Sequence, residues 1–255
     1  MNWLFKDPTQ RLQFALRNPL YALGSLYREF TLADERFLSS MTGVPSRTIR
    51  AFLDEPLDTA FFSALLRESE STLRGLQVHS ADLYAKKVLV QYITIRACRP
   101  EIVVETGVAN GVSSAYILLA LQKNQKGTLY SIGLNDPQYL PTGKSLGWIV
   151  PDSLKTRWKL LTGDSLVLLP SLLDQLGRID LFIHDSLHTY DHMLWEFRTA
   201  FPHLRPGGLL FSDDAGWNAA FSDFCKEVSP EHSAILRGIG FLQKPLQPQR
   251  GAVPA

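Results

Sequence analysis

The chain has little cysteine, no long apolar run and no excess of charge, and each shortage excludes a class of protein. Cys98 and Cys225 are the only cysteines in 255 residues, which is too few for a disulfide framework, so we expect reduced thiols in a cytoplasmic protein. No stretch reaches the roughly 18 apolar residues of a membrane span. Lys6, Asp7 and Pro8 interrupt the apolar start, which is not typical of a signal peptide. With 26 basic against 25 acidic residues, we expect no nucleic-acid or membrane partner.

The first hundred residues read as helical. Asp7-Pro8 and Asn18-Pro19 are typical helix starts, with an acceptor side chain before a proline. Thr42-Gly43 ends one helix, and Ser80–Asp82 caps a long helix over 83–98. We therefore interpret residues 1–100 as a helical extension. Its frequent aromatic residues either pack a core, which we favour, or form a lid that covers the site.

From Glu101 onward, apolar strands alternate with helices. This alternation predicts a doubly wound, Rossmann-like α/β fold with a mostly parallel sheet. Strands are expected at 102–105, 128–132, 158–162, 179–184 and 207–211, and helices at 112–123, 152–157, 166–175, 188–200 and 216–227.

The end of the chain has a different pattern. Ser233–Arg237 and Gly240–Leu242 predict two short strands without a helix between them, so we expect an antiparallel hairpin that completes a seven-stranded sheet. We place the second domain at 101–244 and a flexible tail at 245–255.

The stretch Ile102–Ser114, which reads IVVETGVANGVSS, predicts a buried strand, a glycine turn and a helix start. Backbone N–H groups at such a junction lie close to a bound ligand. The pattern is E-x-G-x-x-x-G, which departs from the G-x-G-x-x-G of dinucleotide folds.

Polar residues follow all five predicted parallel strands, at the edge of the sheet where ligands bind in such folds. Helix capping explains an acid at one strand end, but it is a poor explanation for acids at four of the five. The acids are Glu105, Asp164, Asp185 and the pair Asp213-Asp214.

These motifs resemble those of class I S-adenosylmethionine-dependent methyltransferases over about the last 150 residues. Ile102–Ser114 resembles motif I of that family. Further matches are SIGLN at 131–135, GDS at 163–165, IHDSLHTY at 183–190 and LRPGGLLFSDD at 204–214.

The resemblance implies the cofactor contacts. It assigns the methionine part to Glu105, Gly107, Gly111 and Ser113, and the adenine side to Asp164 and Ser165, with Asp185 also near the cofactor. The family's ribose-binding acid is replaced by Gly133. Either Asn135 or Asp136 substitutes for it, or Asn135-Asp136-Pro137 is only a turn.

The acids after the fourth and fifth strands predict a metal site. If these strands are neighbours, Asp185, Asp213 and Asp214 converge, and three carboxylates so close together require a cation. Oxygen ligands favour Mg²⁺ or a similar ion. The triad resembles that of metal-dependent catechol and sugar O-methyltransferases. The alternative is that Asp213-Asp214 caps a helix.

Three histidines follow the fourth strand. His184, His188 and His192 have the H-x-x-x-H spacing of a zinc site, which we consider a weaker interpretation. His188 is expected at the mouth of the site as a general base, with Asp185 as a second catalytic residue. The sugar methyltransferases carry an acid where Leu187 stands here. A capping or substrate-orienting role for His188 remains an alternative.

The sequence therefore predicts a methyltransferase that uses S-adenosylmethionine and a divalent metal to methylate a hydroxyl of a small molecule. Two other functions remain open, an NAD(P)-dependent oxidoreductase and a cofactor-binding module without activity. A homodimer is also possible. We expect the loop Asp136–Pro151 to be a lid, in which Trp148 and Tyr139 either cover the acceptor or bury the loop.

Overall fold

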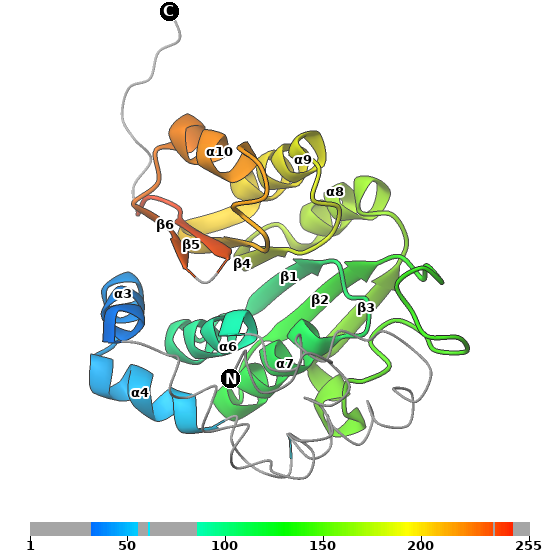
Figure 1. Cartoon of the computed structure of the whole chain (residues 1–255), viewed down its shortest axis with the longest axis horizontal. Coiled ribbons are helices and arrows are strands. Elements are labelled where there is room, and N and C mark those ends of the chain that lie inside the picture. Colours follow the sequence, from blue (N-terminus) through cyan, green and yellow to red (C-terminus); the bar gives the residue numbers. More distant parts are fainter. Residues whose placement is uncertain (1–31, 56–60, 62–85, 237, 247–255) are drawn as a thin grey trace, which may run out of the picture. The chain divides into compact units, whose positions relative to one another are not determined.

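The computed structural model describes residues 32–55, 61, 86–236 and 238–246 (Figure 1). Several predicted features lie outside these residues: the helix starts at Asp7-Pro8 and Asn18-Pro19, the cap at Ser80–Asp82 and most of the tail. Contacts divide the chain into two compact units. The first comprises Met1–Arg99, Ala109–Lys126 and Asn135–Arg157, and the second comprises Pro100–Val108, Gly127–Leu134 and Trp158–Ala255. The domain division at residues 100 and 244 stays a prediction.

The second unit contains a seven-stranded sheet with the order β3-β2-β1-β4-β5-β7-β6. Strands β1 to β5 pair in parallel, and β7 pairs antiparallel with both β5 and β6. The bounds are β1 Ile102–Thr106, β2 Thr128–Gly133, β3 Trp158–Thr162, β4 Ile179–His184, β5 Leu204–Ser212, β6 His232–Leu236 and β7 Ile239–Gln243. The predicted fold class is confirmed, including the terminal hairpin.

Helices α8 (Ser165–Leu176), α9 (Tyr190–Ala200) and α10 (Ala220–Val228) gather beside this sheet (Figure 1). Their apolar side chains share one core with a row of strand residues. Val104, Phe182 and Leu210 are register partners on β1, β4 and β5, and all three are fully buried. Phe197 of α9 and Phe224 of α10 pack in the same cluster. Because side chains alternate along a strand, this core defines one face of the sheet.

Strand β5 begins earlier than predicted, at Leu204 rather than at residue 207. Arg205 and Pro206, which precede the predicted strand, therefore lie inside β5. A register shift against β4 accommodates the extra residues, because Ile179 pairs with Leu204 while Leu181 pairs with Leu209. Gly207 has a φ of +71° there, which glycine adopts without strain.

Helix positions also differ in detail from the predictions. Residues 152–157 form a 3₁₀ helix, η3 (Asp152–Arg157). Helix α9 starts two residues later than predicted and continues into η4 (Phe201–His203). Helix α10 starts at Ala220 rather than at residue 216, after a series of turns. Helix ends of this kind are the least certain part of a sequence-based prediction, since side-chain periodicity does not define them.

The described residues of the first unit form helices and the loop over 135–151. It contains α3 (Leu32–Thr42), α4 (Ser46–Asp54), α6 (Lys86–Cys98), α7 (Val112–Asn124) and η3. Gly43 ends α3 as predicted, with a φ of +70° and its N–H bonded to the Ser39 carbonyl. Helices α6 and α7 lie side by side (Figure 1). No helix among the described residues is long and apolar enough to cross a bilayer.

Candidate active site

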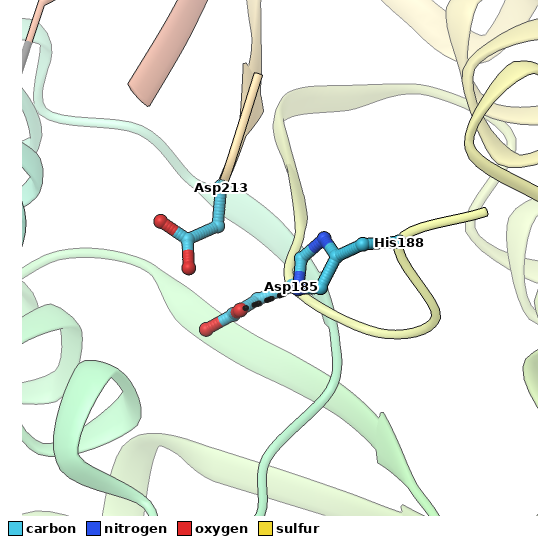
Figure 2. A group of neighbouring side chains, drawn as sticks. All are labelled: Asp185, His188 and Asp213. Atoms are coloured by element: carbon cyan, nitrogen blue, oxygen red, sulfur yellow. Dashed lines mark ion pairs between the residues drawn. The ribbon is translucent and has the colours of Figure 1, made fainter. Parts of the chain in front are cut away.

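Two acids and a histidine meet at the carboxyl ends of β4 and β5. Asp185 follows β4 and Asp213 follows β5, and these strands are neighbours, with His184 paired to Ser212. One ligand atom from each of Asp185, His188 and Asp213 lies within 4.8 Å of the others. Figure 2 shows the two carboxylates facing one another, with the His188 ring beside Asp185. Of the predicted metal ligands, Asp185 and Asp213 are thus brought together.

Asp214 lies beside this group rather than in it. Its φ is +47°, so the chain turns immediately after Asp213. Its carboxylate is 44% exposed, and its Oδ2 lies 4.0 Å from Nε2 of His188. In the described part of the chain, His188 occupies the third position that the sequence assigned to Asp214.

The acids around His188 change its protonation. Its Nε2 lies 3.7 Å from Oδ1 of Asp185. Interaction with Asp185 raises the pKa of His188 above its ordinary value, although burial acts in the opposite direction. Asp214 and Asp213 raise this pKa further. The imidazole therefore holds a proton more readily than a free histidine and offsets part of the negative charge.

The chemistry of this group suits a divalent cation. Carboxylate oxygens are hard ligands that bind Mg²⁺ and Mn²⁺, and an imidazole nitrogen is a good ligand for Mn²⁺ and later transition metals. Asp185 is 24% exposed and Asp213 is buried. An ion there would have protein ligands on one side and open positions for water or a hydroxyl on the other.

The other two histidines of the H-x-x-x-H pattern do not join the group. Nδ1 of His184 lies 2.6 Å from Oε2 of Glu196, and Nε2 of His192 lies 3.0 Å from Oε1. Both rings therefore bind one buried carboxylate. This arrangement does not support the three-histidine zinc site.

Glu105, at the start of the glycine turn, is fully buried. Its Oε2 accepts a hydrogen bond of 2.8 Å from the Ser131 hydroxyl, which in turn accepts one of 2.9 Å from the Trp158 indole N–H. Gly107 lies so close to the end of β4 that a Cβ there would sit 1.8 Å from the Asp185 carbonyl oxygen. The turn and the acidic group are therefore neighbours within the second unit.

Residues 109–113 belong to the first unit. Gly111 precedes α7 with a φ of +89°, and a Cβ there would meet the backbone of Gly147 at 2.7 Å. The loop holds this turn, since Gly147 N–H bonds to the Ala109 carbonyl and the Trp148 indole N–H bonds to Oδ1 of Asn110. Ser113 is buried in α7. Trp148 thus packs the loop against the turn, whereas Tyr139 is 63% exposed.

The residues predicted near ribose and adenine have local roles. Gly133 ends β2, and its carbonyl accepts from Gly163 N–H. Asn135 is exposed, and Asp136 Oδ1 accepts from Gln138 N–H, which is a turn contact. Asp164 caps α8 through Leu166 N–H.

Sequence reasoning missed Glu196. This residue is fully buried in α9, where it lies on the same face as Met193 and Phe197. An acid among the apolar positions of a helix was the signal, because buried carboxylates need several hydrogen-bond donors.

The seven-stranded sheet and the glycine turn agree with the Rossmann-like fold that the resemblance implied. Residues 104–215 match the model of a family described as a methyltransferase domain. The matched segment is less than half of the chain, and it contains most of the motifs on which the resemblance rests.

A curated relative is demethylmacrocin O-methyltransferase from Streptomyces fradiae. It is 35% identical over 67 residues, which are 26% of this chain and 17% of that protein. The match thus spans about one sixth of the relative's length.

Solved structures share the fold. The SAH-bound methyltransferase PaMTH1 of Podospora anserina has a TM-score of 0.53 at 16% identity, over 71% of this chain and 87% of that one. TomG of Streptomyces achromogenes, an O-methyltransferase of tomaymycin synthesis in complex with SAM, has a TM-score of 0.50 at 18% identity. That match covers 73% of this chain and 90% of TomG.

Proposed function

We propose that the protein transfers a methyl group from S-adenosylmethionine to a hydroxyl of a small molecule, with help from a divalent cation. The observation that carries the proposal is the group of Asp185, His188 and Asp213 beside the turn at Gly107. This neighbourhood joins a set of cation ligands to the segment that resembles the methionine site of the family. A methyl donor and a metal-bound hydroxyl are the two partners that such a site would bring together.

The cofactor residues follow the resemblance. They are Glu105, Gly107, Gly111, Ser113, Asn135, Asp136, Asp164, Ser165 and Asp185. Glu105 is fully buried, and a carboxylate at this place after the strand suits the positively charged amino group of the methionine part. Asn135, which is exposed, and Asp136, which is half-buried, are proposed on the resemblance and on their place after β2.

Asp185 and Asp213 would hold the cation, with His188 beside it. A bound cation lowers the pKa of a hydroxyl and orients it. With both partners bound, the acceptor oxygen would attack the methyl carbon as the bond from carbon to the sulfonium sulfur breaks, and S-adenosylhomocysteine would leave with the electron pair of that bond. His188 would accept the hydroxyl proton. Orientation and proton removal are the contributions of the chain itself.

Calorimetric titration tests the cofactor. We expect micromolar binding of S-adenosylmethionine and no binding of NAD. NAD binding alone would instead support the oxidoreductase. Failure to methylate any member of a panel of catechols, sugars and macrolides, despite cofactor binding, would support the inactive binding module.

The metal role is tested with Asp213→Ala. We expect the variant to lose Mg²⁺-dependent transfer and Mn²⁺ binding, because one of two carboxylate ligands is removed. Its affinity for S-adenosylhomocysteine should stay within about threefold of the wild-type value, which is less than the tenfold change that 1.4 kcal/mol represents. Full wild-type activity in excess chelator would refute metal assistance.

A further inference from the structure

The carboxylate of Glu196 is fully buried in α9, and it collects four polar contacts. Oε2 lies 2.5 Å from the Thr106 hydroxyl and 2.6 Å from Nδ1 of His184. Oε1 lies 2.9 Å from the Ser186 hydroxyl and 3.0 Å from Nε2 of His192. Burial alone raises the pKa of Glu196, but the hydrogen bonds from His184 and His192 outweigh it and hold the pKa well below its ordinary value. The group is therefore a buried anion.

These contacts converge on the segment that carries Asp185. His184 and Ser186 flank Asp185 in the sequence, and both bind Glu196 through their side chains. The backbone of Asp185 is held from the other side, since its N–H donates to the Thr106 carbonyl at 2.8 Å. Thr106 also binds Glu196. One carboxylate thus fixes both neighbours of Asp185 and the strand end against which Asp185 rests.

The same anion reaches the start of α8. Nε2 of His192 lies 3.2 Å from the Ser165 hydroxyl as well as 3.0 Å from Glu196. Ser165 follows β3, in the segment that resembles the adenine side of the cofactor site. The end of β1 and the segments after β3 and β4 are therefore joined around Glu196, although they lie far apart in the sequence.

We propose that Glu196 is a positioning residue that fixes Asp185 and the strand ends around it for cofactor and metal binding. The inference rests on the proposed function, because Asp185 is assigned to both ligands there. Glu196 touches neither ligand. It acts through His184, Ser186 and Thr106, as outer-shell groups orient the ligands of a metal.

Glu196→Gln tests this role with little change of shape. In the wild type, one carboxylate oxygen binds Thr106 and His184, and the other binds Ser186 and His192. An amide has only one oxygen, so its NH₂ group faces one of these two pairs of donors. We expect the affinity for Mn²⁺ alone, measured by electron paramagnetic resonance, to fall about tenfold or more. The affinity for S-adenosylhomocysteine, measured by calorimetry, is expected to fall by a similar factor.

Asp180→Asn is the matched control. Asp180 binds the N–H groups of Glu101 and Ile102 and the Arg205 side chain, at the opposite end of β1 and β4. We expect this variant to lower the melting temperature and leave both ligand affinities unchanged. A purely structural Glu196 would give the same pattern, and that result would overturn the proposal.

Ser186→Ala removes one contact and carries the test if Glu196→Gln does not fold. We expect a smaller loss of Mn²⁺ affinity than in Glu196→Gln, and unchanged affinities would overturn the proposal.

Hydrogen exchange at residues 183–188 gives a readout without any ligand, and we expect faster exchange of the Asp185 N–H in both variants. If the wild type binds no Mn²⁺ but the Asp185 N–H still exchanges faster in the variants, the metal role is refuted and the positioning of Asp185 by Glu196 is supported. Unchanged exchange in the variants would overturn only the positioning of Asp185 by Glu196.

Discussion

At the scale of single residues, Gly107 has the least room for a side chain among the glycines that the structure describes. A Cβ there would overlap the Asp185 carbonyl oxygen, and the φ of +86° is also unfavourable for other residues. We expect Gly107→Ala to lower stability by about 1–2 kcal/mol for the backbone angle and by about 1–3 kcal/mol more for displaced backbone. Denaturant unfolding measures the change.

Gly143→Ala separates these two effects. Gly143 has a similar φ of +77°, but a Cβ there would meet no atom within 4 Å. It should lose only about 1–2 kcal/mol, the cost of the angle. Equal losses in the two variants would contradict the close approach of Gly107 to Asp185.

His188 is the residue to which we assign proton removal. We expect His188→Ala to lower kcat by about 10²–10⁴-fold, the usual contribution of a general base. The affinity for S-adenosylhomocysteine should stay within the error of calorimetry. An unchanged kcat would remove His188 from the mechanism, whereas a lost affinity for Mn²⁺ would make it a metal ligand.

At the scale of elements, Glu55 connects the end of α4 to α6. Its Oε1 accepts from Nη2 of Arg96 at 2.7 Å, and its Oε2 accepts from the Tyr92 hydroxyl at 2.7 Å and from Nε of Arg96. Burial raises the pKa of Glu55, but the hydrogen bonds from Arg96 and Tyr92 outweigh it and lower the pKa below 4.5. The contact therefore stabilises the fold fully above pH 4.5, and the stabilisation is lost as the pH falls through the lower folded pKa.

Glu55→Gln should consequently lower the free energy of unfolding at pH 7 by about 1–2 kcal/mol, a range reduced for its partial exposure. The difference from the wild type should shrink below pH 4.5, where Glu55 of the wild type also becomes protonated. Asp152→Asn is the control, because Asp152 forms an exposed pair with Lys155. A difference that stays constant down to the lowest pH at which the protein folds would refute the charged contact.

At the scale of the whole molecule, the alternation of strands and helices predicted the five parallel strands, and the pattern at the end of the chain predicted the hairpin that completes the seven-stranded sheet. The meeting of Asp185, Asp213 and Asp214 was predicted on the condition that β4 and β5 are neighbours, and the structure brings the first two of these acids together. The sequence did not predict the turn at Asp214, because a φ of +47° in an aspartate depends on the surrounding contacts. Glu196 was missed because its donors lie at four separate places in the chain. Tertiary contacts of this kind leave no periodic pattern.

The hydrogen-bonded chain from Trp158 through Ser131 to Glu105 gives the protein its own optical reporter. Indole emission depends on the partner of the N–H group, and hydrogen bonds in a chain polarise one another. A ligand that binds Glu105 would therefore change the environment of Trp158, which lies on the edge strand two strands away. The chain has five tryptophans, so a variant that keeps only Trp158 would report on the buried end of the glycine turn without a label.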